Sequence, residues 1–233
     1  MVLIPGLAMS GKYFRPLAQL LVEHHPVMVL ELPGFGRSTA LRRALSMPEH
    51  AAWLAEWMQE RGIATAHFVG HSMGCQVVAH LAARSADRVK TLTLIGPTVD
   101  LHARRRAPQI GRLMRDFMQE RPAVLWWAVV DVLRAGLVRT WRTSTAMLAD
   151  PVEEQFARIT APTLLLRGQN DALAPERWLE TAARSLPTSR WQTIPAGAHC
   201  VQFSEPTRTA SLVLAWINEW ANARTGAVIP GQG

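Results

Sequence analysis

The chain of 233 residues is long enough for one domain with a sizeable core, with or without an inserted lid. Its composition, 48% hydrophobic and 18% charged, is that of a globular protein. The most apolar stretch, residues 123–138, contains Asp131 and Arg134, so we expect no membrane span. The N-terminus lacks a basic region before an apolar run, which excludes a secretory signal of the usual kind. The only two cysteines, Cys75 and Cys200, exclude a disulfide framework and favour a reduced, cytoplasmic protein.

The net charge of +7 comes from arginine, because lysine occurs only at Lys12 and Lys90. An arginine-rich surface suits nucleic acid, anionic lipid or acidic substrates. The densest run, residues 104–106, is only three arginines long and has no interleaved aromatics, so we interpret it as a solvated face at the start of a helix. We therefore expect a small-molecule substrate and no nucleic-acid partner. No Cys–His spacing suits a structural metal, and we expect no metal or other cofactor.

Apolar, β-prone stretches alternate with amphipathic ones through the first hundred residues. Strands are predicted at residues 1–4, 26–32, 65–69 and 89–95. Helices are predicted at residues 13–23, 47–61 and 75–85. Ser46 is expected to cap the second of these helices, with Pro48 in its first turn. The strand at 26–32 is nearly all apolar, which predicts burial on both of its faces.

The pattern changes after residue 100. Residues 101–160 contain no convincing strand and are expected to form helices at 106–119, 122–138 and 151–159. Alternation then resumes with a strand at 162–167, a helix at 175–185, a strand at 190–194 and a last helix at 205–223. The domain organisation predicted is a core in two parts, 1–100 and 161–223, a helical lid at 101–160, and a disordered tail at 224–233.

Strands alternating with helices indicate an α/β fold, with a mostly parallel sheet covered by helices on both faces. Right-handed crossovers place the carboxyl ends of parallel strands at one edge of the sheet, where ligands bind in such folds. The segment 101–160 leaves from that edge and returns to it. We therefore expect it to cover a binding site.

A Gly-x-Ser-x-Gly motif occupies residues 70–74, between a predicted strand and a predicted helix. This context is typical of a nucleophile elbow, a turn so tight that flanking side chains would collide with neighbouring elements. Ser72 then lies at a helix N-terminus, whose free N–H groups stabilise a developing oxyanion. The motif predicts that Ser72 is a nucleophile.

A serine nucleophile needs a base, and the base needs an orienting acid. Asp171 lies in the loop after the strand at 162–167, and His199 lies in the loop after the strand at 190–194. Both loops are expected at the same sheet edge as Ser72. The order Ser, Asp, His along the chain is that of α/β-hydrolases.

Together these features identify the chain as similar to the α/β-hydrolase superfamily, and within it to the branch of capped serine esterases and carbon–carbon bond hydrolases. The resemblance covers almost the whole chain. Its landmarks are residues 31–38, the motif at 70–74, the loop at 168–171, and Gly197-Ala198-His199 followed by Glu205-Pro206. The resemblance implies that Ser72 is the nucleophile, His199 the base and Asp171 the acid. It also implies an oxyanion hole formed by the backbone N–H groups of Leu7 and Met73.

The chain departs from the family pattern in several places. Pro5 stands where the family usually has histidine, Glu31 where aspartate is more usual, and Cys75 where a second glycine is more usual. The opening strands of the family also have no counterpart before residue 1, which leaves the strand at 27–32 as an exposed edge, open to pairing with another chain. A homodimer is one expectation from such an edge.

Alternatives remain open for several residues. Asp100 is a rival acid, because it also follows a strand and some relatives take their acid there. His71 is expected to shape the elbow, although it also neighbours the substrate pocket, and His102 lies in a turn that is either part of the pocket or solvated. The lid aromatics and methionines would form either an apolar acyl pocket or merely the underside of the lid: Trp126, Trp127, Trp141, Met114, Met118 and Met147.

The function expected is that of a carboxylesterase-like serine hydrolase, which cleaves a small, largely apolar ester or thioester through an acyl-enzyme. A carboxylate on the substrate, attracted by lid arginines, is a weaker expectation. A carbon–carbon bond hydrolase for a diketone, or an acyltransferase or thioesterase, would use the same three residues. A further alternative is a catalytically weak pseudo-hydrolase that interacts with partners through its exposed strand.

Overall fold

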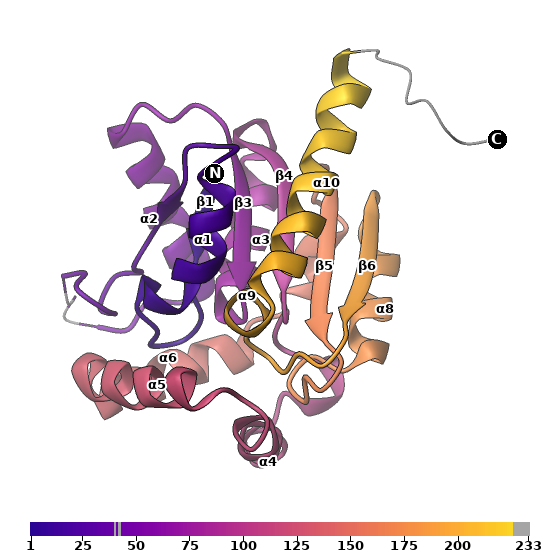
Figure 1. Ribbon diagram of the computed structural model, residues 1–233. Helices are drawn as coiled ribbons and strands as arrows, with labels where there is room; N and C mark the ends of the chain where they lie inside the picture. Colours follow the sequence, from indigo (N-terminus) through magenta and orange to yellow (C-terminus); the bar gives the residue numbers. More distant parts are fainter. Residues whose placement is uncertain (40, 42, 226–233) are drawn as a thin grey trace.

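The computed structural model describes residues 1–39, 41 and 43–225 of the chain (Figure 1). Six strands form one sheet in the order β2-β1-β3-β4-β5-β6, and every neighbouring pair is parallel. The strands are β1 (Val2–Ile4), β2 (Met28–Val29), β3 (Ala66–His71), β4 (Val89–Ile95), β5 (Thr163–Gly168) and β6 (Ser189–Ile194). The α/β class predicted from the sequence is confirmed. Most of the expected tail, residues 226–233, lies outside the described residues.

Helices cover both faces of this sheet because successive strand residues point to opposite sides. In β1, Val2 and Ile4 belong to one apolar core and Leu3 to the other. The first core is closed by α2 (Met47–Glu60), α3 (Met73–Arg84) and α8 (Glu176–Ser185). The second is closed by α1 (Arg15–Leu21), α9 (Val201–Ser204) and α10 (Pro206–Thr225). Short 3-10 helices, at Gly11–Phe14, Ala86–Arg88 and Leu101–Ala103, complete the connections.

The segment 101–160, which we call the insert, contains four α-helices after the 3-10 helix at Leu101–Ala103. They are α4 (Arg106–Phe117), α5 (Pro122–Ala135), α6 (Leu137–Ala149) and α7 (Glu153–Phe156). Figure 1 shows α4, α5 and α6 beyond the arrowheads of β3 and β5, across the carboxyl ends of the strands. The insert therefore lies over the sheet edge where ligands bind in parallel α/β folds.

Two expectations about helices were wrong in detail. The sequence predicted one helix at 122–138 and none at 139–150, but Gly136 adopts φ 85° and separates α5 from a further helix, α6. A left-handed backbone at glycine is a common helix end. The last helix, expected at 205–223, begins at Pro206 and is preceded by the short helix α9, which the sequence did not predict. Glu205 separates the two because its φ of −130° and ψ of 54° are not helical.

The strand expected at 26–32 is shorter and less buried than the sequence predicts. Strand pairing extends only over Met28–Val29, and both residues are half-buried rather than buried on both faces. The reason is position, since β2 lies at the end of the sheet and pairs with β1 alone among the described strands. Whether this edge pairs with a second chain stays a prediction. Within the described residues, no helix is long and apolar enough to cross a membrane.

Candidate active site

Ser72 stands between β3 and α3 in a strained backbone conformation. Its φ of 53° and ψ of −121° lie in a region that non-glycine residues rarely adopt. The turn is tight because α3 packs directly against β1: a Cβ added at Gly74 would come within 2.3 Å of the Ile4 carbonyl oxygen. Glycine at 74 is thus required by this close approach, and the turn holds Ser72 at the first turn of α3.

His199 and Asp171 form a buried pair. His199 Nδ1 lies 2.9 Å from Asp171 Oδ2, and both side chains are almost fully enclosed. The other carboxylate oxygen, Oδ1, accepts hydrogen bonds from the backbone N–H groups of Leu173 and Ala174, both at 2.9 Å. Arg167 donates to the backbone carbonyl of Asp171. The loop after β5 is therefore built to fix the direction of this carboxylate.

The charges of the pair support each other. Burial by itself raises the pKa of Asp171, but His199 and the hydrogen bonds to the carboxylate hold that pKa below its usual value. Burial likewise lowers the pKa of His199, and three carboxylates, Asp171, Asp116 and Glu120, outweigh it and raise the pKa to about 9. His199 Nε2 is buried and has no hydrogen-bond partner among the described residues. The nitrogen that faces away from Asp171 is therefore available for a further proton transfer.

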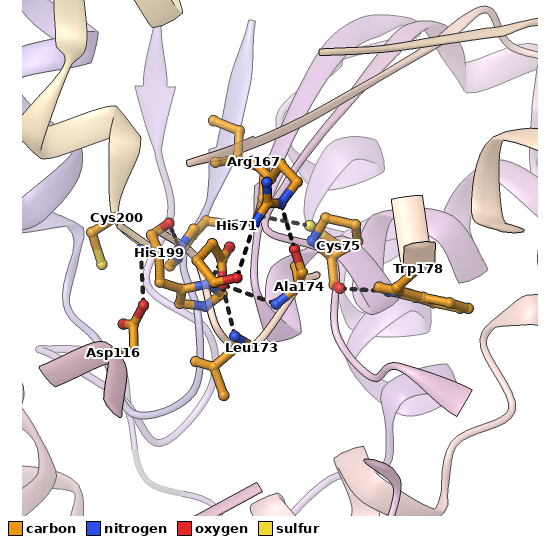
Figure 2. A network of polar contacts seen from close by, with 12 residues as sticks. His71, Cys75, Asp116, Arg167, Leu173, Ala174, Trp178, His199 and Cys200 are labelled. Atoms are coloured by element: carbon orange, nitrogen blue, oxygen red, sulfur yellow. Dashed lines mark hydrogen bonds and ion pairs between the residues drawn. The ribbon is translucent and has the colours of Figure 1, made fainter. Parts of the chain in front are cut away.

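Asp116 and Glu120 come from the insert and were not singled out in the sequence. Asp116 Oδ1 accepts the backbone N–H of His199 at 3.2 Å, as Figure 2 shows, and Glu120 Oε1 accepts that of Cys200 at 2.6 Å. Both carboxylates are buried. Burial first, and then the other carboxylates, raise the pKa of Asp116 to about 7. The sequence offers one indication of their role: the two acids stand one helical turn apart at the end of a predicted helix.

His71 and Tyr13 connect the elbow to two loops. Tyr13 Oη accepts the N–H of Gly6 at 2.7 Å and lies 2.8 Å from His71 Nδ1, while His71 Nε2 lies 3.2 Å from the carbonyl oxygen of His199. A carbonyl only accepts, so His71 Nε2 carries the proton and Nδ1 accepts from Tyr13. Burial, followed by the nearby His199, lowers the pKa of His71 well below its usual value. His71 is thus a neutral bridge that positions the loops around Ser72.

The backbone of the loop after β1 runs against Ser72. A Cβ added at Gly6 would lie only 3.1 Å from Ser72 Cβ. Leu7, the next residue, lines the same cavity as Ser72. Neither the N–H of Leu7 nor that of Met73 donates a hydrogen bond to any described residue. Two N–H groups are therefore free next to Ser72.

A cavity of about 710 Å³ contains Ser72 at its wall. Leu7, Thr98 and Leu173 contribute from the core, and the insert supplies the remaining lining. Its walls are mostly apolar, with these insert residues: Arg106, Gln109, Ile110, Leu113, Leu137, Val138, Thr140, Trp141, Arg142, Ser144, Met147 and Leu148. Such a composition suits a small molecule with an apolar group held near Ser72.

The three tryptophans of the insert have different positions. Trp141 lines the cavity, and the Arg106 guanidinium lies 3.7 Å from the centre of its ring. Trp126 is 67% exposed on the outer side of α5. Trp127 packs edge-on against Phe203, with ring centres 5.2 Å apart. Of the three, Trp141 alone is brought to the cavity that contains Ser72.

Asp100 is occupied elsewhere. Its Oδ2 accepts hydrogen bonds from Arg112 at 2.8 Å and Arg177 at 3.1 Å, and its Oδ1 accepts the N–H of His102. His102 itself is exposed. The carboxylate of Asp100 therefore ties α4 and α8 to the end of β4, while Asp171 is the acid in contact with His199.

Both cysteines are free and buried, and burial raises the pKa of each thiol well above its usual value. Neither is therefore a ready thiolate at neutral pH. Among the described residues, no group of three or more His, Cys, Asp or Glu side chains has the arrangement to hold a metal ion.

Comparison with known proteins identifies the family. Residues 1–125 match the family described as the alpha/beta hydrolase fold. A relative named "Putative carbamate hydrolase RutD", from Serratia proteamaculans (strain 568), is 25% identical over 97% of this chain and 93% of its own. Esterase YbfF from Escherichia coli (strain K12) is 24% identical over 94% of this chain and 92% of its own.

The fold comparison agrees. A solved thermophilic esterase from Thermogutta terrifontis superposes with a TM-score of 0.81 at 23% identity, covering 94% of this chain and 89% of that chain. The family match spans more than half of the 233 residues. The chain belongs to the α/β-hydrolase fold family and is a hydrolase.

Proposed function

We propose that the protein is a serine hydrolase in which Ser72 attacks a carbonyl carbon. The observation that carries this proposal is the strained Ser72 at the wall of the cavity, with the buried His199–Asp171 pair at the same sheet edge. The rings of His199 and His71, the residue just before Ser72, lie 4.6 Å apart. His199 is the base, and Asp171 holds its proton on Nδ1 so that Nε2 receives the serine proton.

The reaction follows from these roles. Ser72 Oγ bonds to the substrate carbonyl carbon as its proton passes to His199 Nε2, and the carbonyl oxygen becomes an oxyanion. The N–H groups of Leu7 and Met73 stabilise that oxyanion, each worth about 3 kcal/mol by analogy with measured oxyanion-hole donors. His199 then protonates the leaving group, which departs, and an acyl-enzyme remains. Water, deprotonated by His199, attacks the acyl-enzyme, and the proton returns to Ser72 as the acid is released.

The raised pKa of His199 constrains this mechanism. A base must be neutral to accept a proton, and a pKa of about 9 leaves His199 mostly protonated at pH 7. We expect kcat/KM to rise with pH through the neutral range as His199 loses its proton. An apolar substrate that excludes water from the cavity would also disfavour the charged form of His199 and lower its pKa.

The cavity favours a small, largely apolar acyl group. Its apolar walls come mostly from α4 and α6, which act as a lid in this proposal. Arg106 and Arg142 also line it, so a carboxylate at the far end of the substrate is a second option. The names of the relatives, an esterase and a carbamate hydrolase, agree with cleavage of a carbonyl–heteroatom bond.

Labelling with a fluorophosphonate probe tests the proposal directly. The probe phosphonylates an activated serine, so we expect one label per chain on Ser72, and none in Ser72→Ala. A series of p-nitrophenyl esters with lengthening acyl chains then maps the cavity. Lack of labelling in folded wild-type protein would overturn the proposal. Turnover of a diketone without turnover of esters would reassign the reaction to carbon–carbon bond cleavage.

A further inference from the structure

The exposed apolar residues of the molecule gather on the insert. Of the thirteen large hydrophobic side chains that are exposed among the described residues, ten lie on α4, α5 and α6 or at their ends. We call them the outer apolar surface: Ile110, Leu113, Met114, Met118, Trp126, Val129, Leu133, Leu137, Val138 and Trp141. Monomeric proteins rarely leave so many apolar side chains together in water, and such a surface marks an interaction site.

Helix α4 shows that this exposure is built into the sequence. Its buried positions carry Gln109 and Asp116, while Ile110 and Met114 at helical spacing are 54% and 59% exposed. Neither apolar core includes any residue of α4, every residue of which is described. An amphipathic helix normally buries its apolar side. Here α4 attaches through its polar side and leaves its apolar side exposed, with Ile110 and Leu113 at the cavity that contains Ser72 and Met114 outside it.

Helix α5 packs apolar residues such as Val124 and Val132 against the cores, yet it also exposes an apolar stripe. Trp126, Val129 and Leu133 follow one another at helical spacing and are each more than half exposed. The acid of the helix, Asp131, is 1% exposed and accepts two hydrogen bonds from Ser10, through its N–H and its hydroxyl. The outward stripe of α5 is therefore apolar as well.

The charges of the insert are divided in the same way. The whole insert contains ten arginines and six acids, a net charge of +4. Residues 101–149, which hold α4, α5 and α6, contain nine of these arginines and three of the acids, a net charge of +6. All three acids point inward, Asp116 to His199, Glu120 to Cys200 and Asp131 to Ser10. The guanidinium groups of four exposed arginines make no hydrogen bond or ion pair with a described residue: Arg105, Arg115, Arg134 and Arg142. The exposed charge of residues 101–149 is therefore entirely positive, whereas α7 carries the exposed acid Glu154.

The outer apolar surface also continues into the cavity. Half of its members line the cavity that contains Ser72, and these come from α4 and α6: Ile110, Leu113, Leu137, Val138 and Trp141. The cavity thus opens on the same part of the molecule that exposes apolar residues. A molecule dissolved in a lipid layer against this surface would reach Ser72 without crossing water.

We propose that the outer apolar surface and its arginines dock on an anionic lipid surface. Outward apolar side chains interleaved with cations are what a helix needs in order to lie in the headgroup region of a negatively charged membrane. Nucleic acid would use the arginines and leave the apolar side chains exposed. A second copy of the chain would place two surfaces of the same positive charge together.

Flotation of the purified chain with vesicles tests this. We expect partition into vesicles of phosphatidylcholine mixed with phosphatidylglycerol, roughly tenfold or more above partition into phosphatidylcholine alone, and a loss of that difference at high salt. Arg105→Gln with Arg115→Gln should weaken binding roughly tenfold or more, since each arginine near an anionic surface contributes roughly fivefold. Met114→Ser with Met118→Ser should weaken it to a similar degree by removing apolar insertion.

Matched controls separate a docking surface from overall charge. Arg61→Gln with Arg208→Gln makes the same charge change at exposed sites outside the insert, and Val22→Ser removes an exposed apolar residue elsewhere. These should bind as wild type does, with folding checked by circular dichroism. Absence of partition into the mixed vesicles would overturn the proposal. Equal losses of vesicle binding in the two arginine double variants would also overturn it. So would tight binding of RNA by the wild type, if the methionine double variant still bound vesicles as well as the wild type does.

The proposal does not depend on the reaction assigned to Ser72. Ser72→Ala is expected to bind vesicles as tightly as wild type, because it leaves the outer apolar surface intact. Loss of labelling at Ser72 with intact vesicle binding would reject the catalytic proposal alone. Normal labelling without vesicle binding would reject the docking proposal alone.

Discussion

Strand β4 and helix α4 lie close together in the chain but bury opposite kinds of side chain. Leu92 and Leu94 of β4 are fully buried in an apolar core, whereas α4 buries Gln109 and Asp116 and exposes Ile110, Leu113 and Met114. Burial stabilises β4 by about 25 cal/mol per Å² of apolar surface. Helix α4 relies on a few hydrogen bonds, each worth about 1 kcal/mol net. The sheet is therefore held by packing, and α4 by polar contacts, one of which reaches His199.

The largest expected effect distinguishes the two acids that follow strands. Asp171→Asn should lower kcat by about 10⁴-fold, because the amide disturbs the tautomer in which His199 Nε2 accepts a proton. Asp100→Asn makes the same change in a carboxylate that contacts arginines and should leave kcat within a few-fold. Hydrolysis of a p-nitrophenyl ester at saturating concentration measures both. Equal losses in the two variants would mean that contact with His199 does not define the acid.

A pair of leucines compares the core with the insert directly. Leu165→Ala in β5 removes a fully buried side chain and should lower the free energy of unfolding by about 3 kcal/mol. Leu113→Ala in α4 removes a 38% exposed one and should cost at most about 0.5 kcal/mol. Urea unfolding followed by tryptophan fluorescence gives both values. A cost at Leu113 similar to that at Leu165 would show that α4 is packed as the core is.

Asp116→Asn tests whether α4 influences the base. Removing a negative charge beside His199 destabilises the imidazolium, so the pKa of His199 falls and more of the base is neutral at pH 7. The acidic limb of the kcat/KM profile should move to lower pH by up to about one unit, which is tenfold in rate on that limb. Glu154→Gln, an equal charge change at an exposed site on α7, is the control. An unmoved limb would leave Asp116 with a structural role only.

The same carboxyl should affect stability. Its pKa is about 7 in the folded protein and near 3.8 when unfolded, so folding favours its protonated form. Its contribution to stability is therefore present at low pH and is lost as pH rises from about 4 to 7. Asp116→Asn should lack that decline when the free energy of unfolding is measured across this range.

The smallest expected effect concerns the tryptophans of the insert. Trp141→Ala enlarges the cavity and should raise KM for a long-chain ester roughly fivefold. Trp126→Ala, on the outer side of α5, should leave KM for a water-dissolved ester unchanged. Steady-state kinetics with short and long acyl chains measures the difference. A larger change at Trp126 would indicate that substrates contact the outer side of α5 before they enter the cavity.

Much of the fold could be predicted from the sequence because its signals are local. The strand at 89–95 was predicted with its observed bounds, since its apolar positions serve both covered faces of a parallel sheet. The strand at 26–32 is predicted to be buried for the same reason, yet only Met28–Val29 pair. Apolar composition does not reveal a position at the end of the sheet, which only the resemblance to the family indicated. Helix α6 was missed because its sequence mixes Thr, Ser and Arg with apolar residues after Gly136.

Local sequence patterns were enough to predict the turn at Ser72 and to place Asp171 and His199 on loops at one sheet edge. They were enough because the strand pattern and the parallel connections between strands decide where the loops emerge. Packing between distant elements was needed to bring Asp171, and not Asp100, into contact with His199. The same packing joins Tyr13 to His71, 58 residues away, and Asp116 to His199, 83 residues away. Such contacts depend on how separate elements pack in space, and no local sequence pattern indicates which residues will meet.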